Sequence, residues 1–544
     1  MAEDDSKGTG GVGKPAGSAR NGTGTKARSG AGAGTVKGGG ILPDGFRFGA
    51  AVAHFQVEGG FNGPGEPANN WLWWEMEGHK GPDRRTEISG NAVDFWNGYE
   101  EQLDLAAAMG CNAFRFGISW ARVEPREGEI DSTALDRYVE IVKACGDRGM
   151  KPLVTLHHFT HPAWLGDDFW LSPDSPRRFA SWVELAVGRL KDHVSDWVTI
   201  NEINVVGMGS YMLGGMPPGR FMAMADVATC TDHMIAAHVG AYEVIHRLQP
   251  RANVTTNNTS MSIYELDKFI IDLIAARHYG VDREDVDGWI RERRREWYAA
   301  LPKPSAGESA VRRLSASLAP IGRSGPRFAV SAVPGLPGIK GLPGPFSERA
   351  LPGRPRHSEM ALDAIYASPH PLTLDFVGID YYDPVATHHV VMPGRNTSGS
   401  RWWSPGRPLW EDKVNPAGLV TYIRANLLPD RPLWIVENGL CNRVEGGRSY
   451  PRPDGWTRPE YIRANLAALV EAVDGGMPVG GYFHWSLIDN YEWGSYQPRF
   501  GIHGVERERG TKILATDSMG HDSAGAYRNL IKGLLAGDRS VLTV

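Results

Sequence analysis

The sequence has few cysteines, no long apolar run and no large excess of either charge. Its four cysteines, Cys111, Cys145, Cys230 and Cys441, show neither the spacing of a metal site nor a disulfide framework. Each lies in or beside an apolar stretch, so we expect buried free thiols, as in a reducing compartment. The longest apolar stretches are too short to span a bilayer, and no signal-type run stands near the N-terminus. We therefore predict a cytoplasmic protein that does not bind a membrane.

The charge balance gives no indication of a polyanionic partner. The chain has 58 Lys and Arg residues against 63 Asp and Glu residues, and its formal net charge is −5. We therefore expect no nucleic-acid ligand. The sequence also lacks an HExxH motif, a Cys/His cluster, a Walker loop and a paired-glycine nucleotide fingerprint, so no metal and no cofactor is predicted. The 18 tryptophans could pack on the C–H face of a sugar, although a large core would explain any one of them.

Residues 1–40 differ in composition from the rest of the chain. Gly, Ala, Ser, Thr and Lys predominate there, and large apolar side chains are almost missing. Such a composition cannot bury a core, so a disordered tail is predicted. Its Lys and Arg residues could favour a nucleic-acid or acidic partner, but runs of charge are usually only solvated.

From Phe46 onward, strand-like runs alternate with amphipathic, helix-like runs. Strand–helix alternation predicts a parallel sheet, and eight repeats with nearly continuous apolar strands predict a single α/β domain, a closed (β/α)₈ TIM barrel over residues 41–544. The predicted strands are Phe46–Ala53, Asn112–Ser119, Lys151–His157, Trp197–Ile203, Asn253–Thr259, Asp375–Tyr382, Leu433–Asn438 and Val479–Trp485. The predicted helices include Gly98–Met109, Ser132–Arg148, Ser175–Val194 and Ala524–Leu535.

The connection between the fifth and sixth predicted strands, residues 260–374, is unusually long. Its first part has the pattern of two helices, Tyr264–Tyr279 and Arg283–Leu301, and we expect the arginines of the second on an exposed face. A later Pro/Gly-rich run, Val333–Pro345, has too few triplets for a collagen helix and predicts an extended loop. Because this connection leaves the catalytic end of a barrel strand, we predict a lid.

Two of the predicted strands lead into a glutamate. Leu433–Leu440 reads LWIVENGL and places Glu437 after an apolar run, and Trp197–Asn204 reads WVTINEIN and contains Asn201-Glu202. A carboxylate is costly inside an apolar strand, whereas the C-terminal tips of barrel strands are where catalytic groups lie. Two carboxylates on opposite sides of one sugar are the machinery of glycoside hydrolysis.

Motifs along most of the chain resemble those of glycoside hydrolase family 1, the β-glucosidase family. VENG at Val436–Gly439 resembles the nucleophile motif, and TINE at Thr199–Glu202 resembles the acid/base motif. WSLIDNYEW at Trp485–Trp493 and RFGI at Arg499–Ile502 resemble the family's sugar-binding end, and the match begins at FRFGAAVAHFQVEG, Phe46–Gly59. The resemblance implies the barrel fold and retaining hydrolysis of β-glycosides, and we expect a β-D-glucosidase.

The resemblance also implies roles for single residues. Glu437 would attack the anomeric carbon, and Glu202 would protonate the leaving oxygen and later deprotonate water. Arg115 would keep the nucleophile ionised, and Tyr382 would orient it. The positions implied in sugar binding are Gln56, His158, Asn201, Tyr382, Trp485, Glu492 and Trp493.

Three departures from the family's pattern leave both glutamates in place but make the substrate uncertain. Ile203 stands where the family usually has proline, Phe159 and Thr160 replace a Trp-Asp pair, and Asp380 replaces an asparagine. An ionised Asp380 would raise the pKa of the neighbouring carboxyls, unless it pairs with a nearby Arg or Lys and has no effect.

Three alternatives to a hydrolase of this kind stay open on the sequence. A transglycosidase would use the same intermediate, with an alcohol in place of water. A 6-phospho-β-glycosidase is disfavoured because Glu492 would repel a sugar phosphate, and a glycan-binding pseudoenzyme would require neither glutamate. The predicted partner is a small-molecule glycoside or an oligosaccharide, and the sequence does not indicate the oligomeric state.

Overall fold

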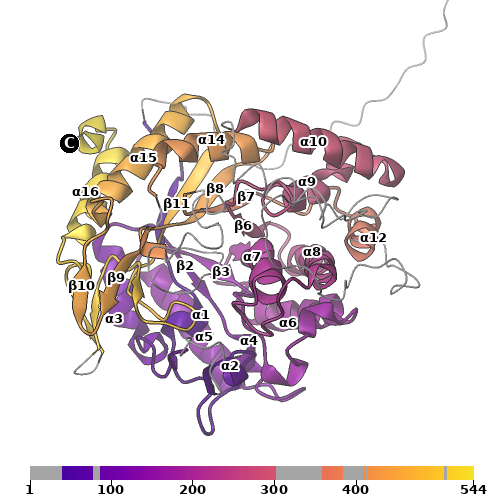
Figure 1. Ribbon diagram of the computed structural model, residues 1–544, viewed down its shortest axis with the longest axis horizontal. Helices are drawn as coiled ribbons and strands as arrows, with labels where there is room; N and C mark the ends of the chain where they lie inside the picture. Colours follow the sequence, from indigo (N-terminus) through magenta and orange to yellow (C-terminus); the bar gives the residue numbers. More distant parts are fainter. Residues whose placement is uncertain are drawn as a thin grey trace, which may run out of the picture.

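Nine parallel strands form one sheet that curves into a barrel in the computed structural model (Figure 1). The structure describes residues 40–76, 86–301, 358–383, 409–411, 413–507 and 511–543. The strands follow the order β5-β4-β3-β2-β1-β11-β8-β7-β6. They are β1 (Arg47–Ala51), β2 (Ala113–Gly117), β3 (Lys151–Thr155), β4 (Asp196–Val198), β5 (Asn253–Thr255), β6 (Asn257–Thr259), β7 (Val377–Tyr381), β8 (Leu433–Asn438) and β11 (Val479–Trp485).

The two edge strands of this sheet, β5 and β6, are pieces of one run. Only Thr256 separates them, β5 pairs with β4, and β6 pairs with β7. The interrupted run therefore joins the two edges, and the barrel has the eight strand positions that the sequence predicts. The prediction of a (β/α)₈ barrel is confirmed.

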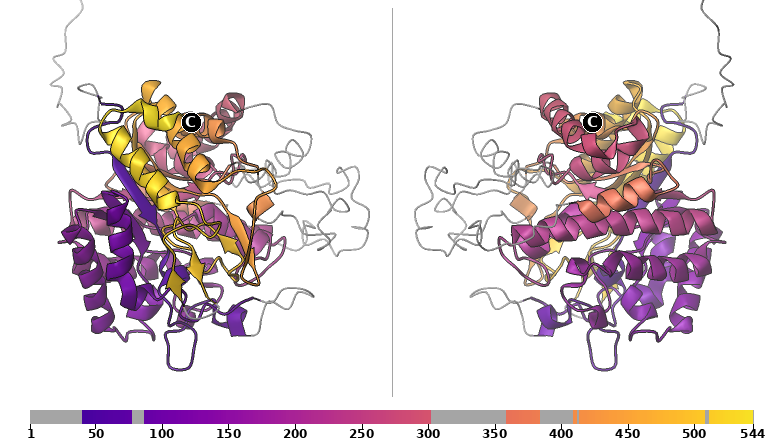
Figure 2. Two further views of the ribbon diagram at one scale, coloured as in Figure 1. Left: turned by 90° about the vertical axis from the view of Figure 1, so that its left-hand side faces the viewer. Right: turned by 90° about the vertical axis from the view of Figure 1, so that its right-hand side faces the viewer.

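Helices surround the barrel, as the two side views in Figure 2 show. The main ones are α3 (Phe95–Ala108), α5 (Ser132–Asp147), α6 (Ser175–Leu190), α8 (Met224–Leu248), α14 (Pro416–Asn426), α15 (Arg458–Asp474) and α16 (Ser523–Leu535). Their first turns carry local signals. Asp131 caps α5 by accepting hydrogen bonds from the backbone N–H groups of Thr133 and Ala134, and Thr457 and Glu460 form a capping box at α15.

The fourth predicted strand is too long. The sequence pattern predicts Trp197–Ile203, but β4 ends at Val198, and helix α7 (Ile203–Gly207) begins at the last residue of the predicted strand. The reason is the backbone of Glu202, whose φ of 44° and ψ of 63° lie in the left-handed region and break the extended conformation. Ile203 thus occupies the first helical position, which is also the position in a helix that tolerates proline best.

The described parts of the insertion are helical and lie outside the barrel. They are α9 (Phe269–Ala275), α10 (Val286–Ala300) and α12 (Glu359–Ala367), with α12 packed on α8 and α10 on α9 and α14. The prediction that the arginines of α10 lie on an exposed face is wrong for two of them. Nε of Arg294 lies 2.6 Å from Glu265, and that of Arg293 lies 3.7 Å from the buried Asp272. The predicted tail up to residue 39 and the Pro/Gly-rich part of the predicted lid lie outside the described residues.

Large aromatic side chains fill the part of the barrel interior away from Glu202 and Glu437. Trp434 stacks on Phe376 with ring centroids 4.2 Å apart, and Phe483 packs on its other side. Gly49 is required beside Phe483, because a Cβ atom on Gly49 would lie 2.4 Å from that ring. Since the apolar rings take up this volume, the polar side chains of the strand tips are confined to the opposite end.

The structure also bears on the expectations about cysteines and membranes. All four cysteines are buried and free, as predicted, and burial raises the pKa of the Cys111 thiol to about 12. In the described ranges, no helix combines the length and the apolar character that crossing a bilayer requires.

Candidate active site

A β-bulge in β8 turns Glu437 toward the barrel interior. Ile379 of β7 pairs with Ile435, and the next residue, Asp380, pairs with Glu437, so Val436 is an extra residue in β8. Side chains alternate between the two faces of a regular strand, and a bulge interrupts that alternation. Val436 and Glu437 therefore both belong to the inside of the barrel, and the carboxylate lies beside that of Asp380.

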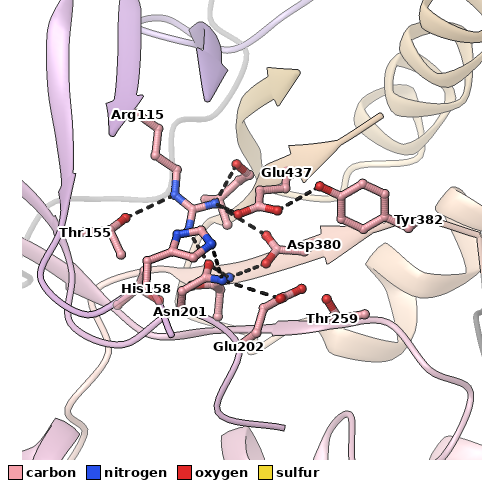
Figure 3. Close-up of polar contacts among 12 residues, drawn as sticks. Arg115, Thr155, His158, Asn201, Glu202, Thr259, Asp380, Tyr382 and Glu437 are labelled. Carbon is pink, nitrogen blue, oxygen red and sulfur yellow. Dashed lines mark hydrogen bonds and ion pairs between the residues drawn. The ribbon is translucent and has the colours of Figure 1, made fainter. Parts of the chain in front are cut away.

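Two side chains donate hydrogen bonds to the Glu437 carboxylate. Nη1 of the buried Arg115 lies 2.7 Å from Oε1, and the Tyr382 hydroxyl lies 2.8 Å from Oε2 (Figure 3). Burial raises the pKa of Glu437, and Arg115 and Tyr382 oppose that rise. Glu437 thus has two donors that stabilise an anion, the environment that the predicted nucleophile requires.

Glu202 has a contrasting environment. Its side chain is 7% exposed, and the one hydrogen bond that a described N–H group makes to it is long, 3.4 Å from Asn201 Nδ2 to Oε2. Burial raises the pKa of Glu202 well above its usual value, and the charges of Asp380 and Glu437 add to the rise. This environment favours the protonated form of Glu202, the state that a general acid needs.

Asn201 connects the two sides of the site. Its Oδ1 accepts hydrogen bonds from Arg115 and from Asn257, which lies 2.9 Å away, and its Nδ2 lies 3.1 Å from Nε2 of His158. Nε2 of His158 must be unprotonated to accept that bond, and burial lowers the pKa of this imidazole well below its usual value. Sequence reasoning missed Asn257, although two asparagines at the end of the predicted fifth strand were a usable signal.

A second polar group, around Glu492, lies at the other end of the site. Gln56 Nε2 donates to Glu492 Oε2 and to Asn490 Oδ1, each at 3.1 Å, and Trp485 Nε1 donates to Glu492 Oε1 at 3.2 Å. Among the described residues, the buried Oε1 of Gln56 has no hydrogen-bond partner. Burial raises the pKa of Glu492 to about 8. This group holds acceptors and a free amide oxygen ready for hydroxyl groups.

Aromatic rings join the two polar groups. The ring of His158 is nearly parallel to those of Trp485 and Trp493, with centroids 5.8 and 5.7 Å away. The backbones that follow β8 and β11 pack closely against each other here. A Cβ atom on Gly439 would lie 1.9 Å from the carbonyl oxygen of Trp485, so the glycine of VENG is needed at this position.

The structure thus brings the sequence-predicted residues to the C-terminal ends of the barrel strands. Arg115, Asn201, Glu202, Asp380, Tyr382, Glu437 and His158 form one connected set, and Gln56, Trp485, Glu492 and Trp493 form the adjoining set. One oxygen from each of Glu202, Asp380 and Glu437 lies within 4.8 Å of the others. In the part of the chain that the structure describes, these three carboxyls are also the one group spaced to share a metal ion, and the Arg115 guanidinium supplies the positive charge beside them.

Known proteins match both the sequence and the fold. A curated relative from Triticum aestivum, the chloroplastic 4-hydroxy-7-methoxy-3-oxo-3,4-dihydro-2H-1,4-benzoxazin-2-yl glucoside beta-D-glucosidase 1d, is 26% identical over 509 residues, 86% of this chain and 80% of the relative. A 6-phospho-beta-galactosidase from Staphylococcus haemolyticus is 25% identical over 513 residues, 86% of this chain and 94% of the relative.

Among solved structures, a beta-glucosidase from Thermotoga maritima in complex with azafagomine has a TM-score of 0.64 at 22% identity. The match covers 91% of this chain and 99% of that one, and it shows a shared fold. The model of glycosyl hydrolase family 1 matches residues 39–290 and 372–533, which together are most of the chain. The protein belongs to glycosyl hydrolase family 1 and is an O-glycosyl hydrolase of the β-glucosidase type.

Proposed function

We propose that the protein hydrolyses β-D-glucosides with retention of configuration, through a covalent glycosyl–enzyme intermediate. The observation that carries this proposal is the spacing of the two glutamates, which have oxygens within 4.8 Å of each other. Retaining glycosidases hold their carboxyl groups about 5–5.5 Å apart, whereas inverting enzymes need about 6.5–9.5 Å to admit a water molecule.

In the first step, Glu437 attacks the anomeric carbon while Glu202 transfers its proton to the glycosidic oxygen. The new carbon–oxygen bond forms as the bond to the leaving group breaks, and the leaving alcohol takes the proton and the electron pair. Arg115 and Tyr382 hold the Glu437 carboxylate from both oxygens. Glu202 is buried, and its raised pKa favours the protonated form that an acid needs.

In the second step, a water molecule gives a proton to the Glu202 carboxylate and attacks the anomeric carbon. The ester bond to Glu437 breaks, the sugar leaves with its original β configuration, and both carboxyls return to their starting states. The two inversions at carbon require that the acid/base and the nucleophile lie on opposite faces of the sugar.

The hydrogen-bonding group around Glu492 fits the hydroxyl groups of an unphosphorylated sugar better than a phosphate. Both Glu492 oxygens already accept N–H groups, and they can accept sugar hydroxyls in the same way. A phosphate brings negatively charged oxygens that need donors, whereas the N–H donors of Gln56 and Trp485 already bond Glu492 and Asn490. The similarity to a 6-phospho-beta-galactosidase therefore makes the 6-phosphorylated glycoside the comparison substrate of choice, and we expect it to be turned over very poorly.

Azide rescue of two variants tests the roles of the glutamates. Glu437→Gly should be nearly inactive, and azide should attack from the vacated side to give an α-glycosyl azide. Glu202→Ala should still be glycosylated quickly by a dinitrophenyl glucoside, whose leaving group needs no proton, and azide should then release a β-glycosyl azide. NMR of the products distinguishes the two anomers. Glu445→Gly, which changes an exposed glutamate of β9 (Asn442–Glu445), is the matched control and should behave as the wild type.

Several outcomes would contradict these assignments. If Glu437→Gly kept substantial activity, or if both azide products had the same anomeric configuration, the nucleophile and the acid/base would be wrongly assigned. An initial α-configured sugar from the wild type would exclude retention. Products formed with an added acceptor alcohol separate hydrolysis from transglycosylation, and complete inactivity on α- and β-glycosides would favour a pseudoenzyme.

A further inference from the structure

A third carboxyl, that of Asp380, lies between the two glutamates (Figure 3). It is fully buried, at 0% exposure, and one of its oxygens lies within 4.8 Å of an oxygen of Glu202 and of Glu437. Three carboxyls at this spacing share one guanidinium, that of Arg115. Like charges in a buried site repel each other strongly, so the three cannot all be ionised at neutral pH. At least one proton rests on this group.

The hydrogen bonds indicate which carboxyls are the anions. Glu437 receives one strong donor at each oxygen, from Arg115 and Tyr382. Asp380 Oδ2 receives an N–H group of Asn257, and its Oδ1 lies 3.7 Å from Nη1 of Arg115. Each of these contacts favours the ionised form of its acceptor.

Glu202 can supply the hydrogen-bond donor that Asp380 lacks. Oδ1 of Asp380 is buried and receives no N–H or O–H donor from any described residue. Within the described ranges, Glu202 receives a single N–H donor, that of Asn201 at 3.4 Å, and the charge of Arg115 is the other influence that favours its anion. A proton on Glu202 would remove the poorly stabilised charge and would also provide the missing donor for Asp380.

We propose that Asp380 is a positioning residue of the catalytic site, which holds the transferable proton on Glu202 by accepting a hydrogen bond from it. This inference rests on the proposed function, because it concerns the acid of that reaction. A hydrogen bond with Asp380 raises the pKa of Glu202, and the same bond lowers that of Asp380, which agrees with the direction of donation.

The charged and titratable groups around Asp380 come from several elements. Burial and the charge of Glu437 on β8 raise the pKa of Asp380, whereas Arg115 on β2 and the hydrogen bonds with Glu202 and Asn257 lower it. The pKa of the Tyr382 hydroxyl is raised well above its usual value by burial and by these carboxylates, so this group stays neutral. On β6, the neighbouring Asn257 is an uncharged donor. Beyond burial itself, the charges that raise the pKa of Glu202 are therefore those of Asp380 and Glu437.

The consequence for catalysis is a change in the alkaline limb of the pH–rate profile. While Asp380 is negative, Glu202 keeps its proton to a higher pH and remains an acid. Once Asp380 is neutralised, Glu202 loses its proton at a lower pH. The effect should appear only with substrates whose leaving group needs that proton.

The test compares wild type with Asp380→Asn, which keeps the size of the side chain, removes its charge and introduces the residue that the family usually has at this position. The pH dependence of kcat/KM is measured with phenyl β-D-glucoside, which needs the acid, and with 2,4-dinitrophenyl β-D-glucoside, which does not. We expect the alkaline limb to move to lower pH by at least about one unit with the phenyl glucoside, and no such movement with the dinitrophenyl glucoside.

A matched control is Asp383→Asn, three residues along the same chain segment. Asp383 is buried and accepts a backbone hydrogen bond from Asn415, which an asparagine oxygen can also accept. This variant should leave the alkaline limb where it is. If Asp380→Asn lowered activity equally at every pH and with both substrates, Asp380 would have only a structural role and the proposal would be overturned.

An infrared measurement tests the proposal without relying on activity. A buried protonated carboxyl gives a distinct C=O stretching band. Because Glu492 also holds a proton at pH 7, the band of Glu202 is read from the wild-type spectrum minus that of Glu202→Gln, and we expect it there at pH 7. In the Asp380→Asn background, the same difference band should disappear at a lower pH. If the wild-type difference spectrum lacked the band at pH 7, Glu202 would not hold the proton and the proposal would be refuted, even if Asp380→Asn did not fold. Inactivity of the wild type on both glucosides would contradict the proposed function alone.

Discussion

Replacing Glu492 by glutamine should change the sign of its effect on stability between acid and neutral pH. The pKa of Glu492 is about 8 in the folded protein, against 4.5 for an unperturbed glutamate. Between those values the unfolded chain has released the proton and the native state has kept it, so the native state binds more protons and stability falls as pH rises. The raised pKa of Glu492 therefore lowers the free energy of unfolding of the wild type at pH 7, and the glutamine variant has no such loss.

The size of the effect follows from the same values. From pH 4.5 to pH 7 the penalty grows by about 1.4 kcal/mol per unit, which amounts to about 3 kcal/mol. Glu492 is only part-buried, so solvent screening lowers this to about 2 kcal/mol. The variant also loses the acceptor for Gln56 Nε2, which costs about 1 kcal/mol. We expect Glu492→Gln to be less stable by about 1 kcal/mol at pH 4.5 and more stable by a similar amount at pH 7.

Urea unfolding followed by far-UV circular dichroism at several pH values measures this difference. Glu460→Gln, at the exposed capping box of α15, is the control with the opposite sign, because hydrogen bonds from Thr457 lower the pKa of Glu460. A difference between Glu492→Gln and wild type that stays constant from pH 4.5 to pH 7 would refute the reasoning, since it would mean that Glu492 does not hold its proton in the folded protein.

Three other variants test the site and the fold. Glu492→Ala should lose about 2–4 kcal/mol of transition-state binding, seen as a drop in kcat/KM of about 30- to 900-fold on β-glucosides; a change below threefold would contradict its role. Tyr382→Phe removes a donor from Glu437 and should lower kcat/KM by about 10- to 150-fold, and the acid limb of the pH profile should move to higher pH. Asp131→Ala removes the cap of α5 and should cost about 1 kcal/mol in urea unfolding at pH 7. The hydrogen bond from Thr133 lowers the pKa of Asp131, so this cost should disappear in acid as the wild-type carboxyl takes up its proton.

The sequence predicted most of the fold because apolar runs determine strands directly. Apart from Trp197–Ile203, the expected strands lie where the pattern puts them, with small differences at their ends. The error at Trp197–Ile203 arose because the pattern of residue types does not reveal the left-handed backbone of Glu202. Single residues were harder to place. Arg293 and Arg294 belong to a charge run that is usually solvated, and only the tertiary structure shows carboxylates facing them.

The candidate site shows the same limit. Motif positions identified the glutamates and the groups around them, but motifs do not contain distances. For Asp380 the sequence left two outcomes open, pairing with a cation or an effect on neighbouring pKa values. Arg115 does lie 3.7 Å away, but burial and the charge of Glu437 outweigh it, and the pKa of Asp380 is raised well above its usual value. Asn257 was missed because its contacts are with residues far away in the sequence. It donates hydrogen bonds to Asn201, which follows β4, and to Asp380 on β7.

The extra residue in β8 means that counting by twos along this strand places Glu437 on the wrong side. Trp434 lies inside the barrel, so strict alternation would put Val436 inside and would leave Glu437 against the surrounding helices. The extra residue of β8 is present relative to both neighbouring strands. Beside β11, Tyr482 pairs with Ile435 and His484 with Asn438, so two residues of β8 lie opposite one of β11; the pairing with β7 shows the same excess. Surveys that select inward-facing residues of barrel sequences by parity would therefore discard Glu437, the residue that we propose as the nucleophile. The last residues of a barrel strand should be exempt from such a filter, because a local irregularity can turn them toward the axis.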